Sequence, residues 1–557
     1  MSGSAAGHVE AAPPVLPEPV TPRRGQDRWA LLAFVLIAVL GFLIYTFVLG
    51  ADVYIGIDDL LVYTSRSGGV LNSLLQPYTT HLVALPFSIE WVIVELFGLT
   101  GGVPFAAVAA GAWIAGASLV RVIARQSGVD SWIATIVAAS VVICGAIYPY
   151  NQPHTLQVPL AVALGLGQVA VANGRRWDTP RMAATIALTV LALSTSAVAM
   201  SFVAATALVL WARRGLKTAV VVVVPPVLLF AAWYLAFGTG QLRALPGPPV
   251  WQQPPSLWLG WMEVGYRAAF QAIGGWLGVG VALAVVAVVG GVLAWQRAVD
   301  HVPLVAPVAL AGAGFLHLVN ILVLRYWFGA QGAGHSRIAY VTVLTLLPLL
   351  AVAFDALARA WRPLGLLVLL LIVPLPLNVA ALREQQAAAV LNTGVQAQSL
   401  AILAESPQLD SVPGWVRPHP IGGFVNGLAS TDVELLRRLR DTGRVPTGTP
   451  PSDGYAAQVP VRLGVAVRDE GPPATTRCRL FSAPTVLDEP VGYRFTVAGA
   501  TSADTTAIDV GLVDDERSWV TFTTAFPGET LPMEVVLPGP YVVRPHEPTS
   551  RFRLCPG

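Results

Sequence analysis

Two adjacent carboxylates, Asp58 and Asp59, follow directly after the first long apolar run of this 557-residue sequence. A carboxylate at such a place can accept a proton from an attacking hydroxyl group as a general base, or it can bind a cation. Two close carboxylates also raise each other's pKa, which favours a base near neutral pH. Because adjacent side chains do not point the same way, we expect one aspartate to face the site and the other to hold the loop.

Imidazole and phenol groups occur beside two further apolar runs. His81 opens the stretch that follows the aspartates, and the segment YPYNQPHT carries Tyr150 and His154 between later runs. Asp58, Asp59, His81 and His154 together offer oxygen and nitrogen ligands of the kinds that bind Mg²⁺ or Mn²⁺. A divalent cation held by these four side chains is therefore an open alternative to a metal-free site.

Two arginines bracket a late break between apolar runs, RYWFGAQGAGHSR. Arg325 begins this segment, and His335 and Arg337 end it. The guanidinium group suits bidentate contacts with phosphate, so the pair could clamp a phosphate; anchoring of helix ends at the membrane surface explains the arginines equally well. Ionisable groups near an apolar slab are costly unless they face a cavity or a partner. The polar set as a whole therefore indicates a cavity that opens to one side of a membrane.

The elements that must position these side chains are transmembrane helices. The chain is 55% hydrophobic and 12% charged, with a mean hydropathy of +0.64, whereas soluble domains carry roughly 25% charged residues. Apolar runs of about 20 residues predict a polytopic α-helical membrane protein with about eleven spans. The net charge of +2 provides no strong field for nucleic acid, so we expect no nucleic-acid partner.

Arginine-rich breaks predict which loops are cytoplasmic. The alternation is consistent if the N-terminus is inside, with residues 1–28 forming a disordered cytoplasmic tail. Residues 29–380 then form the transmembrane domain, and residues 51–80 form its first external loop. With about eleven spans, the C-terminal part of the chain is exported.

Three features of the transmembrane part need separate interpretation. The stretch 182–211 has an arginine cluster at each end. It predicts two short helices that meet at LSTSAVA (193–199), so that the chain returns to the cytoplasm. The segment His81–Phe97 is short and carries two glutamates, so we expect it to dip into the membrane without crossing it. Deep in the run 302–324, His317 and Asn320 lie three apart on one face, which we interpret as an interhelical hydrogen bond rather than a proton relay.

The composition changes from about residue 381. Residues 381–456 predict a helical connector rich in Pro and Gly, and residues 457–557 contain short alternating strands typical of a β-sandwich. If this part lies outside the cell, a disulfide between Cys478 and Cys555 is expected, joining an early strand to the last one.

The layout resembles the GT-C class of membrane glycosyltransferases over about residues 29–380. A first helix is followed at once by an acidic external loop (GIDD, 56–59), and HLVALP (81–86) opens a segment that closes on an LFG turn. An external polar loop, paired short helices and a late HSRIAYV (335–341) complete the similarity. The sequence YTTH departs from the Asn-Gly-His or Asn-Glu-His common in relatives, which weakens the assignment of His81.

The resemblance implies an enzyme that transfers a hexosyl or pentosyl group from a polyprenyl-phosphate donor on the outer face of a bacterial plasma membrane. The acceptor would be an envelope glycan, glycolipid or protein, and the exported β-sandwich would bind or position it. The class usually places its base in the first external loop, here Asp58 or Asp59, and some members use Mg²⁺ or Mn²⁺ while others use none. The predicted substrate-binding residues are His81, Tyr150, His154, Arg325, His335 and Arg337.

Two other kinds of protein share the gross layout. One is a transporter or flippase of an envelope lipid or polysaccharide, and the other is a non-catalytic envelope scaffold whose sandwich binds glycan. Transporters often show inverted repeats and charge at the midplane, whereas the ionisable residues here gather near one face. The scaffold alternative predicts that Asp58 and Asp59 are dispensable.

Overall fold

The computed structural model describes the membrane helices, the connector and the strands of the C-terminal domain. The described residues are 24–51, 53, 70–78, 81–98, 102–143, 156–239, 250–326, 329–416, 432–445, 458, 461, 465–467, 479–481, 483–487, 493–499, 507–513, 515, 518, 520–523, 530–537, 539–545 and 552–556. Five residues of predicted function lie outside them: Asp58, Asp59, Tyr150, His154 and Cys478.

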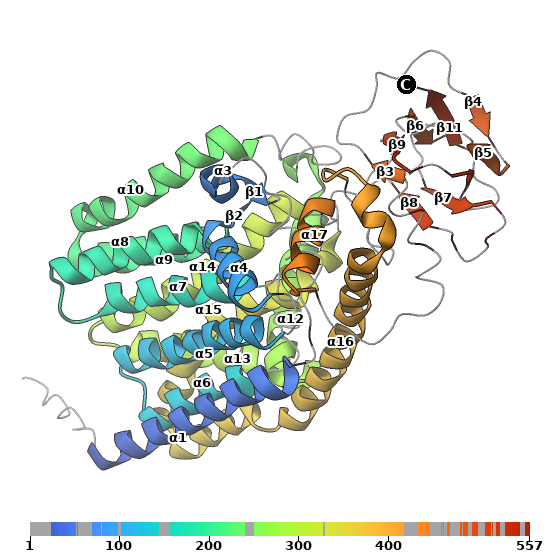
Figure 1. Cartoon of the computed structure of the whole chain (residues 1–557). Helices are drawn as coiled ribbons and strands as arrows, with labels where there is room; N and C mark the ends of the chain where they lie inside the picture. The colour runs from blue at the N-terminus through green and yellow to red at the C-terminus, as the bar shows by residue number, and fades with distance from the viewer. Residues whose placement is uncertain are drawn as a thin grey trace, which may run out of the picture.

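The larger part of the chain is a bundle of helices that run side by side (Figure 1). In chain order its helices are α1 Arg24–Leu43, η1 Ile44–Leu49, α3 Val70–Leu75, α4 Ala84–Phe97, α5 Val103–Gln126, α6 Ser131–Ile143, α7 Gln157–Asn173, α8 Thr179–Leu193, α9 Ala199–Arg214, α10 Leu216–Trp233, η4 Tyr234–Gly238, η5 Val250–Gln252, α12 Pro255–Gly274, α13 Leu277–Arg297, η6 Val302–Leu304, α14 Val305–Arg325, η8 Ala330–Gly334, α15 Ser336–Ala360 and η9 Arg362–Leu371. The connector follows as α16 Leu375–Glu405, η10 Pro407–Ser411 and α17 Val433–Asp441.

Within the described ranges, seven helices are long and apolar enough to cross a bilayer, so the chain is a multi-span membrane protein. They are Asp27–Leu49, Val103–Gln126, Leu216–Gly238, Leu277–Arg297, Val302–Arg325, Ser336–Ala360 and Arg362–Leu391. Among the described residues three shorter apolar helices accompany them, Ser131–Val142, Gln157–Asn173 and Thr179–Leu193. The number of spans, about eleven from the sequence, stays a prediction beside these seven long and three shorter apolar helices.

Helix α15 is the central element of the bundle. Its most apolar stretch is 89% buried inside the protein. Helices α5, α6, α12, α13 and α14 all pack against it. The stacked rings of Trp113 and Tyr340, with centroids 4.8 Å apart, join α5 to α15. The β-rich domain projects at one end of the bundle (Figure 1), and that end is called here the sandwich face.

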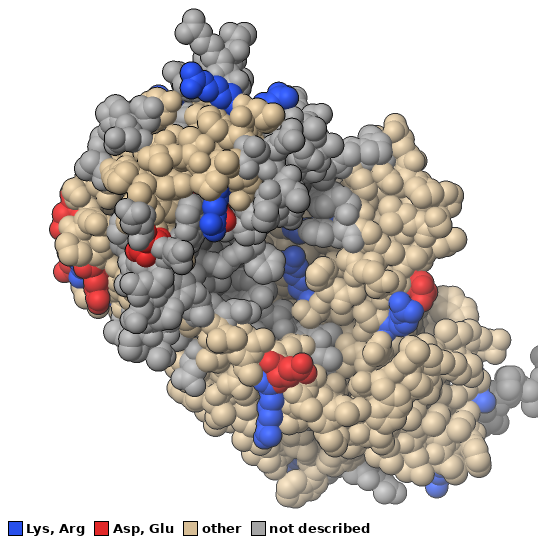
Figure 2. Space-filling view, turned by 90° about the vertical axis from the view of Figure 1, so that its right-hand side faces the viewer, with Lys and Arg blue, Asp and Glu red and all other residues tan. Residues whose placement is uncertain are grey.

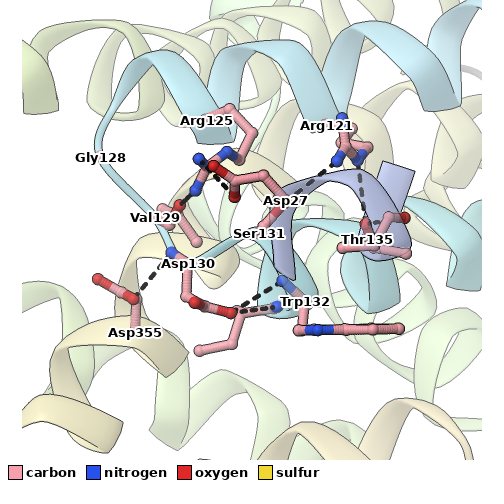
Figure 3. A network of polar contacts seen from close by, with 12 residues as sticks. Asp27, Arg121, Arg125, Gly128, Val129, Asp130, Ser131, Trp132, Thr135 and Asp355 are labelled. Carbon is pink, nitrogen blue, oxygen red and sulfur yellow. Dashed lines mark hydrogen bonds and ion pairs between the residues drawn. The ribbon is translucent and has the colours of Figure 1, made fainter. Parts of the chain in front are cut away.

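A polar network fixes the other end, called here the opposite face (Figure 3). Asp27 near the start of α1 forms an ion pair of 3.1 Å with Arg125 at the end of α5. Asp355 of α15 accepts a hydrogen bond from the backbone N–H of Asp130 at 3.0 Å and pairs with Arg359 at 2.7 Å. The network therefore joins α1, the α5–α6 turn and α15 at the end that lies away from the β-rich domain.

Helices α8 and α9 are short and meet at residues 194–198, which agrees with the predicted pair of short helices. Helix α4 has 14 residues. It begins where the N–H of Leu85 donates to the carbonyl of Ser194 in that junction, and it ends at Gly98 beside Arg444 of the connector. That this helix dips into the membrane without crossing stays a prediction.

Two boundaries differ from what the sequence pattern predicts. The break TGQLRALPGPPVWQQPPSLWLGW (239–261) predicts a loop, but α12 begins within it at Pro255, because the missing N–H of proline costs nothing in the first turn of a helix. The residues Arg383–Leu403 predict an amphipathic helix that leaves the membrane, whereas α16 runs without a break from Leu375 to Glu405.

The connector has a small core of its own. Arg440 of α17 binds Asp410 at 2.8 Å, and Asp432 caps α17 by accepting from the N–H of Leu435. Buried residues of α16, η10 and α17 pack together with Val536, which directly follows a strand of the β-rich domain. The connector thus joins that domain to the end of the membrane bundle.

The β-rich domain consists of two antiparallel sheets. Their strands are β3 Val465–Val467, β4 Arg479–Phe481, β5 Thr485–Leu487, β6 Arg494–Gly499, β7 Ala507–Leu512, β8 Val520–Thr523, β9 Thr530–Val535, β10 Tyr541–Pro545 and β11 Phe552–Pro556. One sheet has the order β5-β10-β7-β8 and the other β3-β9-β6-β11-β4. Buried side chains of both sheets, among them Val510, Phe522, Val497 and Phe552, form one core, so the two sheets make a sandwich.

The sequence predicts eight strand segments: VPVRLGVAV, TTRCRLFSA, VGYRFTVAG, TTAIDVGLV, WVTFTTAF, PMEVVL, YVVRP and FRLCPG. Each of them contains all or part of a strand of the sandwich, and β5 is an additional strand. Cys555 of β11 is disulfide-bonded. Because Cys478 lies outside the described residues, its pairing with Cys555 stays a prediction. A further short hairpin, β1 Pro77–Tyr78 and β2 His81–Leu82, lies in the membrane part.

Candidate functional site

His81 is held in a buried position at the sandwich face. It lies on β2, where it pairs with Tyr78, and only 8% of its surface is exposed. Its Nδ1 accepts a hydrogen bond of 3.3 Å from the backbone N–H of Ala197, in the junction between α8 and α9. Since Nδ1 is the acceptor, the ring proton of a neutral imidazole must be on Nε2. His81 therefore offers one N–H donor to a ligand, and it does not cap α4, which begins three residues later.

The two predicted arginines are electrostatic neighbours of His81. Burial, followed by the charges of Arg325 and Arg337 and then of His317, lowers the pKa of His81 to about 3. The imidazole is therefore neutral near pH 7. Two stretches far apart in sequence, β2 and the break between α14 and α15, thus hold predicted ligand-binding side chains that act on one another electrostatically.

His335 lies at the edge of the same group of side chains. Partial burial, and then the charges of Arg337 and Arg325, lower its pKa below the ordinary value. Its ring is exposed, in contrast to that of His81. Together His81, Arg325, His335 and Arg337 form what is called here the His–Arg cluster.

Buried aromatic and aliphatic side chains hold the two arginines in place. Tyr326, directly after Arg325, and Ile338, directly after Arg337, belong to one apolar cluster with residues of α12 and α14. Within it the indole N–H of Trp261 donates to the carbonyl of Leu318 at 3.0 Å. Packing of the residue that follows each arginine therefore fixes the backbone position of the arginine itself.

The charge of the His–Arg cluster favours an anionic ligand. Within the described part of the chain, no carboxylate forms an ion pair with Arg337. Figure 2, which views the molecule from the side that carries the sandwich, shows that charged side chains are sparse on this face and that most of the described surface is neither basic nor acidic. A phosphate is the natural partner of such a set, because arginine and imidazole N–H groups donate to its oxygens.

The metal-binding alternative finds no support among the described residues. They contain no group of three or more His, Cys, Asp or Glu side chains able to hold a metal ion. His81, the only described member of the predicted set, has Nδ1 engaged by Ala197 and two arginines as neighbours, so its surroundings fit an anion better than a cation.

One part of the site was interpreted wrongly from sequence. His317 was expected to form an interhelical hydrogen bond, but neither of its ring nitrogens has a hydrogen-bond partner among the described residues. The side chain is 1% exposed and lies near enough to His81 for its charge to affect that ring. No sequence signal separates it from an ordinary polar residue in a transmembrane helix. The backbone amide of Ala197, which orients His81, has no side-chain signature at all.

No protein-family model matches this chain, and no curated protein matches it. Its fold is similar to that of ArnT from Cupriavidus metallidurans bound to undecaprenyl phosphate, with a TM-score of 0.44 and 14% identity over 78% of this chain and 89% of ArnT. The apo form of that protein gives a TM-score of 0.42 and 13% identity over 80% and 93%. The apo oligosaccharyltransferase of Archaeoglobus fulgidus gives 0.41 and 14% over 80% of this chain and 70% of that one.

Proposed function

We propose that this chain is a membrane glycosyltransferase that transfers a sugar from a polyprenyl-phosphate donor to an envelope glycan, glycolipid or protein. The observation that carries the proposal is the gathering of His81, Arg325 and Arg337 from two stretches far apart in sequence into one partly buried, anion-binding group. A membrane-embedded lipid phosphate provides the negative charge that these donors require, and its apolar chain can stay in the bilayer.

The chemistry assigned to the site is an inverting transfer. The acceptor oxygen forms a bond to the anomeric carbon while the bond from that carbon to the phosphate oxygen breaks. Asp58 or Asp59 takes the hydroxyl proton, and the lipid phosphate leaves with the electron pair of the broken bond. Arg325, Arg337 and the Nε2–H of His81 stabilise the negative charge that grows on the departing phosphate.

We further infer that the sandwich face lies outside the cell. Basic side chains are concentrated in the turns of the opposite face, as is typical of cytoplasmic loops. The group comprises Arg125, Arg175, Arg176, Arg213, Arg214 and Arg359. In this orientation the sandwich, joined to the bundle through the connector core, can present an envelope acceptor to the His–Arg cluster. A cysteine introduced at position 58 should react with an impermeant reagent from outside the cell. Labelling only from the cytoplasm would show that the sandwich face lies inside the cell.

The decisive experiment is sugar transfer in proteoliposomes with a labelled polyprenyl-phospho-sugar. Loss of the general base should lower the rate by about 10²–10⁴ in Asp58→Asn or Asp59→Asn, whichever residue is the base, with the melting temperature unchanged. Full activity in both variants would overturn the base assignment. Movement of the labelled lipid across the membrane without transfer of its sugar would favour the flippase alternative.

A further inference from the structure

His317 is a buried polar group that the mechanism above does not use. It lies in α14, where 1% of its surface is exposed, and within the described chain neither ring nitrogen has a hydrogen-bond partner. A buried polar group without a partner is costly, and more so at membrane depth, where water is scarce. A buried imidazole whose two nitrogens have no protein partner among the described residues points to a ligand that completes it.

The neighbouring helices do not supply that partner. Helix α14 packs between α9 and α15, and both carry buried hydroxyl groups. Those of Thr342 and Thr345 on α15 donate to backbone carbonyls of their own helix, and Thr206 on α9 does the same. These hydroxyl groups are thus satisfied within their own helices and do not donate to the imidazole.

The position of His317 extends the site away from the arginines. It precedes Arg325 by two turns of α14, about 12 Å along the helix axis, and both residues are electrostatic neighbours of His81. His81 is thus an electrostatic neighbour of both the arginines and His317. A ligand that contacts the arginines and also His317 extends along α14 into the helix bundle.

The donor proposed above has three chemically distinct parts. Its polyprenyl chain has no hydrogen-bonding group, and its phosphate oxygens only accept hydrogen bonds and are held by the arginines. A neutral imidazole presents one donor and one acceptor, and a sugar hydroxyl likewise both accepts and donates. Only the sugar can satisfy both ring nitrogens.

We propose that His317 is a specificity-determining residue that hydrogen-bonds a hydroxyl group of the lipid-linked sugar. The inference rests on the proposed function and deepens it, because it assigns the sugar to the membrane-buried end of the site. A site that hydrogen-bonds a substrate hydroxyl discriminates strongly against analogues that lack it.

The test compares two lipids in nanodiscs that contain the full chain. One is undecaprenyl phosphate, and the other is the tightest-binding member of a panel of undecaprenyl-phospho-mannose, -glucose and -arabinose. His317→Leu should weaken the sugar-bearing lipid at least tenfold and change the Kd of undecaprenyl phosphate less than twofold. His317→Gln, which keeps a donor and an acceptor, should be intermediate.

A stability measurement separates ligand binding from a structural role. Because the imidazole is unpartnered without ligand, the melting temperature of ligand-free His317→Leu should not fall. The matched control is Gln168→Leu in α7: Gln168 is equally buried, but its Oε1 accepts from Thr189 at 2.5 Å, so this variant should melt lower.

Three results with His317→Leu would overturn the inference. They are an equal loss of affinity for both lipids in His317→Leu, no loss for either lipid, and a fall in melting temperature as large as that of Gln168→Leu. Wild-type protein that binds undecaprenyl phosphate but none of the sugar-bearing lipids would overturn the inference and leave the anion site intact. Wild-type protein that binds no lipid phosphate would overturn the proposed function itself.

Discussion

The backbone amide of Ala197 donates a hydrogen bond to Nδ1 of His81 across 116 positions of sequence. This bond fixes the tautomer of the imidazole, so that Nε2–H is directed away from the α8–α9 junction. Two short helices that meet inside the bundle are thus needed to orient one side chain of the His–Arg cluster. The hairpin of α8 and α9 has a positioning role as well as a packing role.

Two substitutions of His81 distinguish the roles of its two ring nitrogens. An Asn side chain can place an acceptor near the Nδ1 position, whereas a Gln side chain can place a donor near the Nε2 position. We expect His81→Asn to keep the melting temperature but to weaken polyprenyl-phosphate binding by about tenfold, the value of one hydrogen bond to a charged group. His81→Gln should bind more tightly than His81→Asn and melt lower. The reverse order in the two measurements would contradict the assigned tautomer.

The buried imidazole should make the protein sensitive to acid. The pKa of His81 is about 3 in the folded protein and near 6.5 in an unfolded chain, so the unfolded state binds more protons below pH 6.5. The contribution of His81 to the free energy of unfolding is therefore fully present above pH 6.5. It is lost as the pH falls toward 3, by at most about 1.4 kcal/mol per pH unit for one group. Thermal unfolding between pH 4 and 7 should show a flatter profile for His81→Asn than for wild type. Parallel profiles would show that the ring is protonated without cost.

Arg337 is the better of the two arginines for testing the anion site. No acidic partner for it exists among the described residues, so Arg337→Gln removes a charge without freeing a buried carboxylate. Loss of charge-assisted hydrogen bonds, each worth about 1.5–3 kcal/mol, should weaken binding of undecaprenyl phosphate by about 10- to 100-fold. The control is Arg267→Gln, since Arg267 of α12 is exposed and paired with Glu263 at 3.0 Å. Equal affinities of the two variants for undecaprenyl phosphate would show that Arg337 does not bind the phosphate.

The network of the opposite face offers a structural comparison for all site variants. Asp355→Ala leaves the N–H of Asp130 and the guanidinium of Arg359 without their acceptor, at a cost of about 1–3 kcal/mol. Asp355→Asn keeps an acceptor and should cost less. Both variants should bind undecaprenyl phosphate as wild type does, because the network lies at the other end of α15 from Arg337. A loss of affinity in the alanine variant would show that the two ends of α15 are coupled.

Local patterns were sufficient to predict the helices, the paired short helices and eight of the strand segments. Strand β5, Thr485–Leu487, was missed because it follows β4 after only three residues, so the sequence gives no separate apolar segment for it. The start of α12 was missed because a Pro-rich segment is typical of a loop, although proline is well accepted in the first turn of a helix.

The site could be predicted only as a set of residue types. Arg325, His335 and Arg337 were recognised because they end apolar runs, and that is a local signal. The bond from Ala197 and the isolation of His317 depend on how α8, α9, α14 and α15 pack, and no pattern within one helix encodes that packing. Sequence reasoning therefore gave His317 a protein partner that the fold does not provide.

Gly98 tests whether the connector holds α4, and through it His81. Its φ of +69° with ψ of −161° belongs to a region essentially restricted to glycine, where another residue costs about 1–3 kcal/mol. A Cβ at this position would also lie 2.8 Å from Cβ of Arg444, whose guanidinium pairs with Glu95 of α4 at 3.1 Å. Gly98→Ala should therefore strain the turn and loosen this pair at the same time.

The matched control is Gly128→Ala on the opposite face, where φ is also positive, +84°, but an added Cβ would meet nothing within 4 Å. Both variants should melt lower than wild type, because both pay for the backbone conformation. Only Gly98→Ala should also weaken undecaprenyl phosphate binding, since α4 follows directly after β2 and displacement of the helix moves His81. Equal affinities in the two variants would show that His81 is held by Ala197 alone, independently of the connector.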